Sequence, residues 1–375
     1  MRWAQTRWWA WRSTRSCLRF NAVPHLFARK VRFGFHVYHK MEAPASIGLT
    51  NTMLRVGYPE ILEEELFGDF PQGIELIPLP YPLDHDVDID VWIPDPYPPR
   101  AIRIAPRLRG VRLVLSLMAG TEWIPGAMGP HVTICNARGA HNVSTAEWTV
   151  GAILAMLKYF PFYFDVQRSG QWKRRFEASA RYATITGDAR PIYPPVMVEE
   201  LAGKTVLLVG YGAIGKEIER MLAPFHVDLL RVARSARTKP LVHAVCDLDS
   251  LLPRADIVVL ILPSTAESNR LIGAHQLALM PQGALLVNAA RGPVVDTDAL
   301  VDALNTGRIR AALDVTDPEP LPEGHPLWSC PNLLITPHVA GSSPQFTPRA
   351  LRTAADELHR YIDGKPLRNV VQAAI

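Results

Sequence analysis

A glycine-rich turn in the second half of the chain has the spacing of a phosphate-binding loop. The stretch GYGAIG supplies Gly210, Gly212 and Gly215, with VLLV before it and KEIERML after it. The first glycine permits a tight turn, the second lets the backbone approach a pyrophosphate, and the third allows close packing of helix on strand. N–H groups at the start of the following helix would bind the phosphates. The sequence therefore predicts a dinucleotide site.

The segment VARSART, residues 232–238, lies where the second strand of such a unit ends. An acidic residue is expected there to hold the ribose hydroxyls of NAD, but the sequence has Ala233 followed by Arg234. Without a carboxylate, a 2′-phosphate meets no repulsion. Arg234 and Arg237 could bind it, with Ser235 as a further donor. The alternative is a pair of solvated surface arginines. We predict NADP as the cofactor, with NAD as the alternative.

Three further segments end strand-like runs with side chains capable of acid–base chemistry. They are VNAARGPVVD with Arg291, DVTDPEPLP with Glu319 and LLITPHVAGSS with His338. Imidazole exchanges protons near neutral pH, a carboxylate beside it favours the protonated ring, and a guanidinium binds carboxylates. Each residue alone is more often structural. Their joint position matters because ligands of open α/β sheets bind at the carboxyl ends of the strands.

A parallel sheet is needed to bring these motifs together. TVLLVG, VDLLRVA, ADIVVLILP, GALLVNAA, IRAALDV and NLLITPH are apolar runs that alternate with helical patterns such as DTDALVDALNTG. This alternation is typical of a doubly wound, Rossmann-type α/β sheet. Upstream, LRVGYP, IELIPLP, VDIDVWIP and HVTICNA are strand-like, and the region around 99–108 is helical. A second α/β unit is therefore expected there.

Together with SLMAGTEW (116–123) and NVSTAEW (142–148), these motifs make residues 54–371 similar to the D-isomer-specific 2-hydroxyacid dehydrogenases. The resemblance implies that Arg291, Glu319 and His338 form the catalytic trio. His338 would exchange the proton, Glu319 would orient its ring, and Arg291 would bind the substrate.

The same resemblance implies further contacts to substrate and cofactor. Backbone N–H groups around Ala119 and Gly120 would hold the substrate carboxylate, and Asp314 would lie near the nicotinamide amide. The expected cofactor-binding residues are Gly210, Gly212, Ala213, Ile214, Gly215, Arg234, Ser235, Arg237, Leu262, Pro263, Ala289 and Asp314. The other histidines, His141 among them, have no such partners and are interpreted as structural.

The domain organisation follows from the order of the elements. A final helix near 347–363 comes after the second sheet is complete and is expected to pack back onto the first unit. We therefore predict a flavodoxin-like substrate domain from residues 53–143 and 342–375. Residues 144–341 would form the dinucleotide-binding domain. The amphipathic run 144–167 is expected between the domains, with Ser144 or Thr145 as N-cap.

The basic character of the chain belongs to one end. The net charge is +4, but residues 1–41 hold nine Arg or Lys and no acid, which leaves 31 basic and 36 acidic residues, or −5, elsewhere. Segment 1–52 is interpreted as translated upstream sequence before Met41 or Met53, as a mitochondrial-type presequence, or as a basic arm. The body gives no electrostatic reason to expect nucleic acid, and no stretch has the ~20 apolar residues of a membrane helix. The four scattered cysteines predict neither disulfides nor a metal site.

The leading interpretation is a cytoplasmic, NADP(H)-dependent reductase of small 2-oxo acids, with glyoxylate and hydroxypyruvate as first candidates and a homodimer expected from the resemblance. Three alternatives stay open: an NAD-linked phosphoglycerate dehydrogenase, a nucleotide-sensing co-repressor, and a basic-arm membrane or nucleic-acid binder. One departure from the family pattern is the extension 173–198, rich in arginine. It is expected to be a surface insertion, or to shape substrate entry or a subunit contact.

Overall fold

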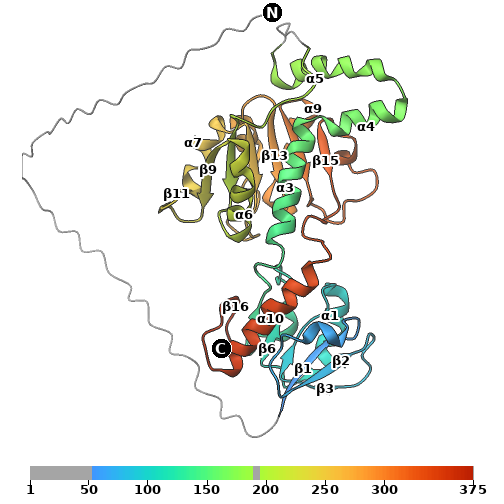
Figure 1. Ribbon diagram of the computed structural model, residues 1–375, viewed down its shortest axis with the longest axis vertical. Helices are drawn as coiled ribbons and strands as arrows, with labels where there is room; N and C mark the ends of the chain where they lie inside the picture. Colours follow the sequence, from blue (N-terminus) through green and yellow to red (C-terminus); the bar gives the residue numbers. More distant parts are fainter. Residues whose placement is uncertain (1–52, 189–194, 375) are drawn as a thin grey trace, which may run out of the picture. The chain divides into compact units, whose positions relative to one another are not determined.

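A computed structural model of the chain describes residues 53–188 and 195–374 (Figure 1). The three interpretations of the basic N-terminal segment concern residues outside these ranges. Within them, two separate parallel sheets carry most of the buried apolar side chains.

The first sheet has six strands in the order β16-β7-β6-β4-β1-β2. Neighbouring strands are parallel, except that β16 runs antiparallel to β7. The strands are β1 (Leu54–Pro59), β2 (Ile74–Leu79), β4 (Val91–Trp92), β6 (Leu113–Leu115), β7 (Thr133–Cys135) and β16 (Val370–Gln372). Short elements nearby are η1 (Glu64–Phe67), η2 (Ala105–Arg107) and a small sheet of β3 (Val87–Asp88) with β5 (Leu108–Arg109).

Two apolar cores cover this sheet, as a parallel sheet requires. Helix α10 (Phe346–Ile362) shares one core with β1 and β6. Helices α1 (Pro98–Ile104) and α2 (Ile124–Met128) share the other with Trp92. Because α10 follows the second sheet in the chain but packs in the core of the first, we retain 53–143 with 342–375, and 144–341, as proposed domain boundaries.

The second sheet has eight strands in the order β10-β11-β9-β8-β12-β13-β14-β15, and all are parallel from β11 to β15. Counted along the chain from β8 and without the edge hairpin strand β10, the order is 3-2-1-4-5-6-7, which begins with the Rossmann order. The α/β prediction is thus confirmed. The strands are β8 (Thr205–Val209), β9 (Asp228–Ala233), β10 (Arg237–Thr238), β11 (Leu241–Ala244), β12 (Ile257–Leu260), β13 (Ala284–Asn288), β14 (Ile309–Leu313) and β15 (Leu333–Ile335).

Helices lie on both faces of the second sheet and bury two further cores. The central strands β8, β12 and β13 are buried almost throughout and nearly all apolar, because helices cover both faces of the sheet there. The helices are α6 (Ala213–Leu222), α7 (Leu248–Leu251), α8 (Ala274–Leu279) and α9 (Thr297–Asn305). Short 3-10 turns are η4 (Ala223–Phe225), η5 (Val245–Asp247), η6 (Leu252–Arg254), η7 (Gly292–Val294) and η8 (Pro326–Ser329).

The predicted run 144–167 forms two helices, α3 (Asn142–Leu157) and α4 (Phe160–Ser169). They separate because Tyr159 takes a left-handed φ of 53° and Pro161 stands in the first turn of α4. The predicted N-cap is wrong, since α3 begins at Asn142 without a side-chain cap. Helix α3 packs on α6 and the second sheet. No single helix in the described ranges is long and apolar enough to cross a membrane; only α3 and α4 together reach that length, bent by 60°.

The extension after α4 is largely helical where the structure describes it. It contains η3 (Trp172–Phe176) and α5 (Glu177–Thr186). Only Ala178 and Ile185 of α5 are buried, which explains why the sequence shows so little periodicity. The backbone of Ile185 packs on Gly283, just before β13. These contacts lie at the amino edge of the second sheet, opposite the edge where its strands lead to the predicted reaction centre.

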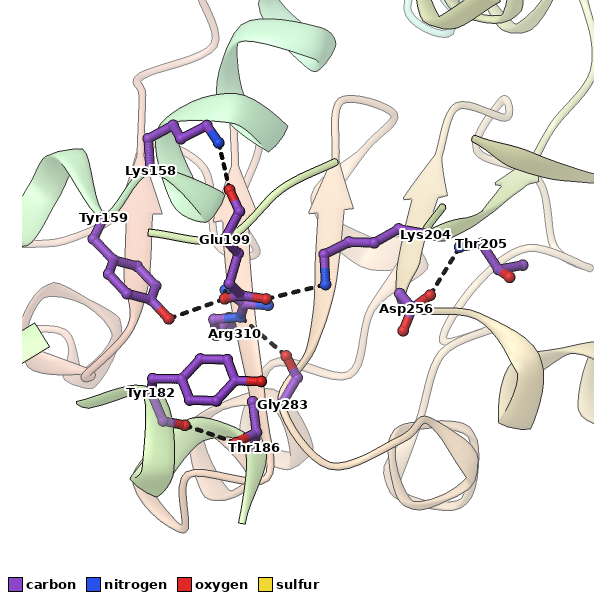
Figure 2. Close-up of polar contacts among 10 residues, drawn as sticks. All are labelled: Lys158, Tyr159, Tyr182, Thr186, Glu199, Lys204, Thr205, Asp256, Gly283 and Arg310. Carbon is purple, nitrogen blue, oxygen red and sulfur yellow. Dashed lines mark hydrogen bonds and ion pairs between the residues drawn. The ribbon is translucent and has the colours of Figure 1, made fainter. Parts of the chain in front are cut away.

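A buried polar network lies at this amino edge, around Glu199, which directly follows the extension (Figure 2). Arg310, at the start of β14, donates to Glu199 at 2.7 Å and to the carbonyl oxygen of Gly283 at 3.0 Å. Glu199 also accepts from Tyr159 at 3.0 Å and from Lys204 at 3.0 Å. Arg310 and Glu199 side chains are only 5% and 8% exposed. Every carboxylate oxygen in the network therefore has a partner, as buried charge demands.

Candidate active site

The carboxyl ends of three neighbouring strands lead to the three residues predicted to do chemistry. Arg291 follows β13, Glu319 follows β14 and His338 follows β15, and these strands pair in parallel in that order. Each side chain stands on a loop just beyond its strand. This is the edge of an open α/β sheet at which ligands bind.

The ring of His338 and the carboxylate of Glu319 form a close pair. His338 Nδ1 lies 2.5 Å from Glu319 Oε1, within hydrogen-bonding distance. The two side chains are 46% and 39% exposed, so the pair is open on one side. Because Nδ1 faces Glu319, Nε2 is the nitrogen that can meet a substrate.

The backbone at His338 takes a conformation that most residues avoid. Its φ is +54°, in the left-handed region, and its N–H donates to the carbonyl oxygen of Asp314 at 2.7 Å. The carboxylate of Asp314, only 3% exposed as a residue, accepts from Thr336 Oγ1 at 2.6 Å and from the N–H groups of Val339 and Ala340 at 2.9 Å. Asp314 thus holds the loop that carries the histidine. Sequence reasoning assigned Asp314 to the cofactor and missed this second role.

Arg291 is fixed by the turn after β13. The side chain of Asn288 accepts from the N–H of Ala290 at 3.0 Å and donates to the carbonyl oxygen of Arg291 at 3.1 Å. A Cβ at Gly292 would overlap the backbone oxygen of Thr316, so only glycine lets the two strand-end loops touch. Arg291 is thereby anchored beside the loop that leads to Glu319.

The loop after β6 in the first sheet faces Arg291. A Cβ placed on Gly120 would lie 2.5 Å from Arg291 Nη2. The Asn136 side chain donates to the carbonyl oxygen of Ala119 at 2.9 Å and fixes the loop. In residues 53–188 and 195–374, the N–H groups of Ala119 and Gly120 have no hydrogen-bond acceptor. They are therefore free to bind an anion next to the guanidinium.

Glu122 in the same loop is a residue that sequence reasoning missed. Its Oε1 lies 3.8 Å from Arg291 Nη2, and its side chain is 62% exposed. The motif SLMAGTEW contained it, but a lone acid after a strand is ordinarily a solvated surface group.

The glycine turn has the geometry expected of it. Gly210 has φ +110°, and a Cβ there would overlap the carbonyl oxygen of Ile261. A Cβ at Gly215 would lie 2.5 Å from the oxygen of Gly210. Gly212, by contrast, has no heavy atom within 4 Å of such a Cβ. Its open side, together with the N–H groups of Ala213 and Ile214 in the first turn of α6, fits a pyrophosphate.

One of the two predicted ribose-binding arginines contacts this turn. Arg237, in β10, donates to the carbonyl oxygen of Tyr211 at 3.2 Å. Arg234 and Ser235 are exposed in the link between β9 and β10. Hydrogen bonds from Thr265 and the local backbone lower the pKa of Glu267, and the charge of Arg234 lowers it further. The link after β9 therefore lies near the loop after β12.

The other predicted cofactor contacts continue along the same edge. Leu262 and Pro263 begin the loop after β12, which Ser268 closes by donating to the Pro263 oxygen at 2.8 Å. Ala289 follows β13, and its N–H donates to Leu260 at 3.2 Å. The expected cofactor residues thus follow five strands that are neighbours in the sheet, in the order β9, β8, β12, β13 and β14.

His141, interpreted from the sequence as structural, contacts the segment that leads to α10. Its ring stacks on Phe346 at 4.4 Å, and Nδ1 lies 3.3 Å from the oxygen of Gly341. Burial lowers the pKa of His141 against the opposing effect of the Gly341 contact, and the charges of Arg291 and His338 lower it further. Ser144 also donates to Gly341 at 3.0 Å. These contacts join the two segments through which the chain passes between the sheets.

Comparison with known proteins agrees with this geometry. Residues 150–340 match the model of the D-isomer specific 2-hydroxyacid dehydrogenase NAD-binding domain. A glyoxylate reductase of Thermofilum pendens is 36% identical over 247 residues, which cover 64% of this chain and 68% of that protein. A mitochondrial formate dehydrogenase of Hordeum vulgare is 31% identical over 301 residues, or 76% and 75% of the two chains.

A solved structure shares both the fold and part of the sequence. It is a D-isomer specific 2-hydroxyacid dehydrogenase of Xanthobacter autotrophicus Py2 in complex with NADPH and MES. The TM-score is 0.68 and the identity 26%, over 85% of this chain and 98% of that one. The chain therefore belongs to the family of D-isomer specific 2-hydroxyacid dehydrogenases, NAD(P)-dependent oxidoreductases that act on a CH–OH group.

Proposed function

We propose that this chain uses NADPH to reduce a small 2-oxo acid, with glyoxylate and hydroxypyruvate as the first substrates to test. The observation that carries the proposal is the His338–Glu319 pair at 2.5 Å on the strand edge that also holds Arg291. A carbonyl reduction needs one group that delivers a proton and one that fixes the substrate carboxylate. This edge offers both.

The protein's part in the reaction is to position and to protonate. Protonated His338 donates from Nε2 to the keto oxygen, while Glu319 stabilises the positive ring and orients it. Arg291, with the free N–H groups of Ala119 and Gly120, binds the carboxylate. The nicotinamide cofactor supplies the hydride. In the reverse direction His338 takes the proton of the hydroxyl group.

The His338–Glu319 pair also bears on which relative is the better guide to function, the glyoxylate reductase or the formate dehydrogenase. Oxidation of formate removes a hydride from a carboxylate and leaves CO₂, so no hydroxyl proton has to be moved. A glutamate that supports a protonated imidazole serves a reaction in which a proton travels with the hydride. The His338–Glu319 geometry therefore supports 2-oxo acid reduction over formate oxidation.

The choice of NADP rests on the ribose end of the cofactor site. Ala233 offers no negative charge there, Arg237 contacts the glycine turn, and Arg234 is exposed at the end of β9. Replacing Ala233 with Asp and both arginines with Gln should move the preference towards NADH. A wild-type enzyme that prefers NADH would make these arginines ordinary surface residues.

Steady-state reduction of four 2-oxo acids with NADPH and with NADH tests the proposal as a whole. Glyoxylate, hydroxypyruvate, 3-phosphohydroxypyruvate and oxaloacetate separate the substrate classes. Preferential turnover of one of the first two with NADPH is the expected result. NADH-linked turnover of 3-phosphohydroxypyruvate alone would support the phosphoglycerate dehydrogenase alternative. Absence of turnover with all four would favour the nucleotide-sensing alternative.

We also propose a cytoplasmic homodimer. Helix α4 and the turn η3 that follows it present Phe164, Trp172 and Phe176 with 59%, 76% and 51% exposure, an aromatic surface typical of an interface. Light scattering should give twice the chain mass, and Trp172→Glu should reduce it. Trp328, 54% exposed on a different loop, provides the matched control Trp328→Glu. Fractionation of the source cells tests the location.

A further inference from the structure

Glu122 brings a second negative charge to the place where the substrate anion is expected. Its carboxylate lies 3.8 Å from the Nη2 of Arg291. Oε2 of the same residue would be 3.0 Å from a Cβ on Gly120. The acid therefore borders both groups proposed to hold the substrate, the guanidinium and the free backbone N–H groups.

The contact between Glu122 and Arg291 is too loose to block the site. At 3.8 Å it is an ion pair and not a hydrogen bond, and both side chains are partly exposed, at 62% and 34%. Such pairs contribute little stability. Arg291 Nη1 donates to the backbone oxygen of Ala290 at 2.8 Å, so that Nη2 is the nitrogen that faces the loop of Gly120 and Glu122. A substrate carboxylate can therefore share the guanidinium with Glu122.

A carboxylate that stays beside a bound anion discriminates among substrates by charge. It repels a second negative group on the substrate, and a separation of a few ångströms in partly exposed surroundings makes this on the order of a tenfold effect. The carboxylate also accepts hydrogen bonds but donates none, so it favours a substrate that carries a hydroxyl group on the carbon adjacent to the keto carbon.

We propose that Glu122 is a specificity-determining residue that selects 2-oxo acids with a single negative charge and disfavours those with a second carboxylate or a phosphate. The inference rests on the proposed function, because it assumes that Arg291 binds the substrate carboxylate. It refines that function by excluding a chemical class of substrate.

The test compares wild type with Glu122→Gln, which keeps the shape and removes the charge. The measured quantity is kcat/KM for oxaloacetate and 3-phosphohydroxypyruvate, divided by kcat/KM for glyoxylate. This ratio should rise on the order of tenfold in Glu122→Gln. Glu122→Asp, which retains the charge, should keep the wild-type ratio. Glu63→Gln removes an exposed acid from the same domain as a control.

The outcomes separate the inference from the function on which it rests. If wild type reduces glyoxylate and Glu122→Gln leaves the ratio unchanged, Glu122 is only a surface charge and the inference is overturned, while the proposed function stands. If Glu122→Asp shifts the ratio as much as Glu122→Gln does, shape and not charge is responsible, and the inference again fails. If wild type reduces none of the four acids, both are overturned.

Discussion

Strand β14 carries an ionic system at each end, and the two systems differ in exposure. At the amino end, Arg310 and Glu199 are almost completely buried, and Glu199 also accepts hydrogen bonds from Tyr159 and Lys204. Beyond the carboxyl end, His338 and Glu319 form an isolated pair that is nearly half exposed. The same strand thus has a buried ionic network at one end and a solvent-exposed ion pair beyond the other.

The difference separates stability from chemistry. A buried charge whose partner is removed is left without solvent or counter-ion, which costs about 3–5 kcal/mol. An exposed pair contributes at most about 1 kcal/mol, because water replaces the lost partner. Changes in the amino-end network should therefore lower the free energy of unfolding, whereas changes in the carboxyl-end pair should lower kcat.

The largest expected effect is on turnover when His338 is replaced by Asn. Loss of the proton donor should lower kcat by about 10²- to 10⁴-fold, with little change in melting temperature. Asn is chosen over Ala because His338 has φ +54°, a conformation that Asn tolerates. Steady-state kinetics and thermal unfolding of the same preparation give both quantities.

The matched control is His275→Asn. His275 lies 3.1 Å from Asp249 on the surface, in a histidine–carboxylate pair away from the strand edge. This variant should keep wild-type turnover. If His338→Asn retains more than a tenth of the wild-type kcat, His338 is not the proton donor.

The second effect should be a loss of stability when Arg310 is replaced by Met. Glu199 would keep Tyr159 and Lys204 but lose its closest cation, and the free energy of unfolding should fall by about 3 kcal/mol. Lys204 still pairs with Glu199 in this variant, so the loss should lie at the lower end of the range for a broken buried pair. Denaturant unfolding of wild type and variant measures it. If Arg310→Met is as stable as wild type, the buried network does not stabilise the fold, and the contrast with the exposed pair fails.

Asp314 lies between these extremes, and its replacement by Asn should affect both properties. The carboxylate accepts three hydrogen bonds from the loop that carries His338, and an amide nitrogen cannot accept them. One buried donor left unpaired costs about 1–3 kcal/mol. We expect that loss in unfolding free energy together with a lower kcat. A variant that loses kcat but no stability would mean that Asp314 acts on the cofactor alone.

The sequence was most informative where function requires a residue type at a strand end. Arg291, Glu319 and His338 each follow a run too apolar to be anything but a buried strand, so parallel pairing alone brings them to one edge. The glycine turn was predictable for a similar reason, since Gly210 has a backbone that other residues rarely adopt.

The amino-end network could not be predicted in the same way. Glu199 and Arg310 are far apart in the chain, and neither stands in a motif. Their pairing depends on how the extension folds back, and α5 has too few buried residues to reveal itself as a helix. Glu122 was missed because its significance lies in a contact with Arg291, from the other sheet, that no local pattern encodes.

The smallest expected effect is a pH dependence of stability at the buried end. Burial alone would raise the pKa of Glu199, but Arg310 and Lys204 outweigh it and hold that pKa below its usual value. A carboxyl group with a depressed pKa stabilises the fold above its unfolded pKa of about 4.3. This stabilisation is lost as the pH falls through the lower, folded value. The difference in melting temperature between wild type and Glu199→Gln should therefore be constant from pH 7 to about pH 5 and shrink below about pH 4. A difference that stays constant on further acidification would show that the charge of Glu199 contributes nothing to stability, and that its hydrogen bonds alone contribute.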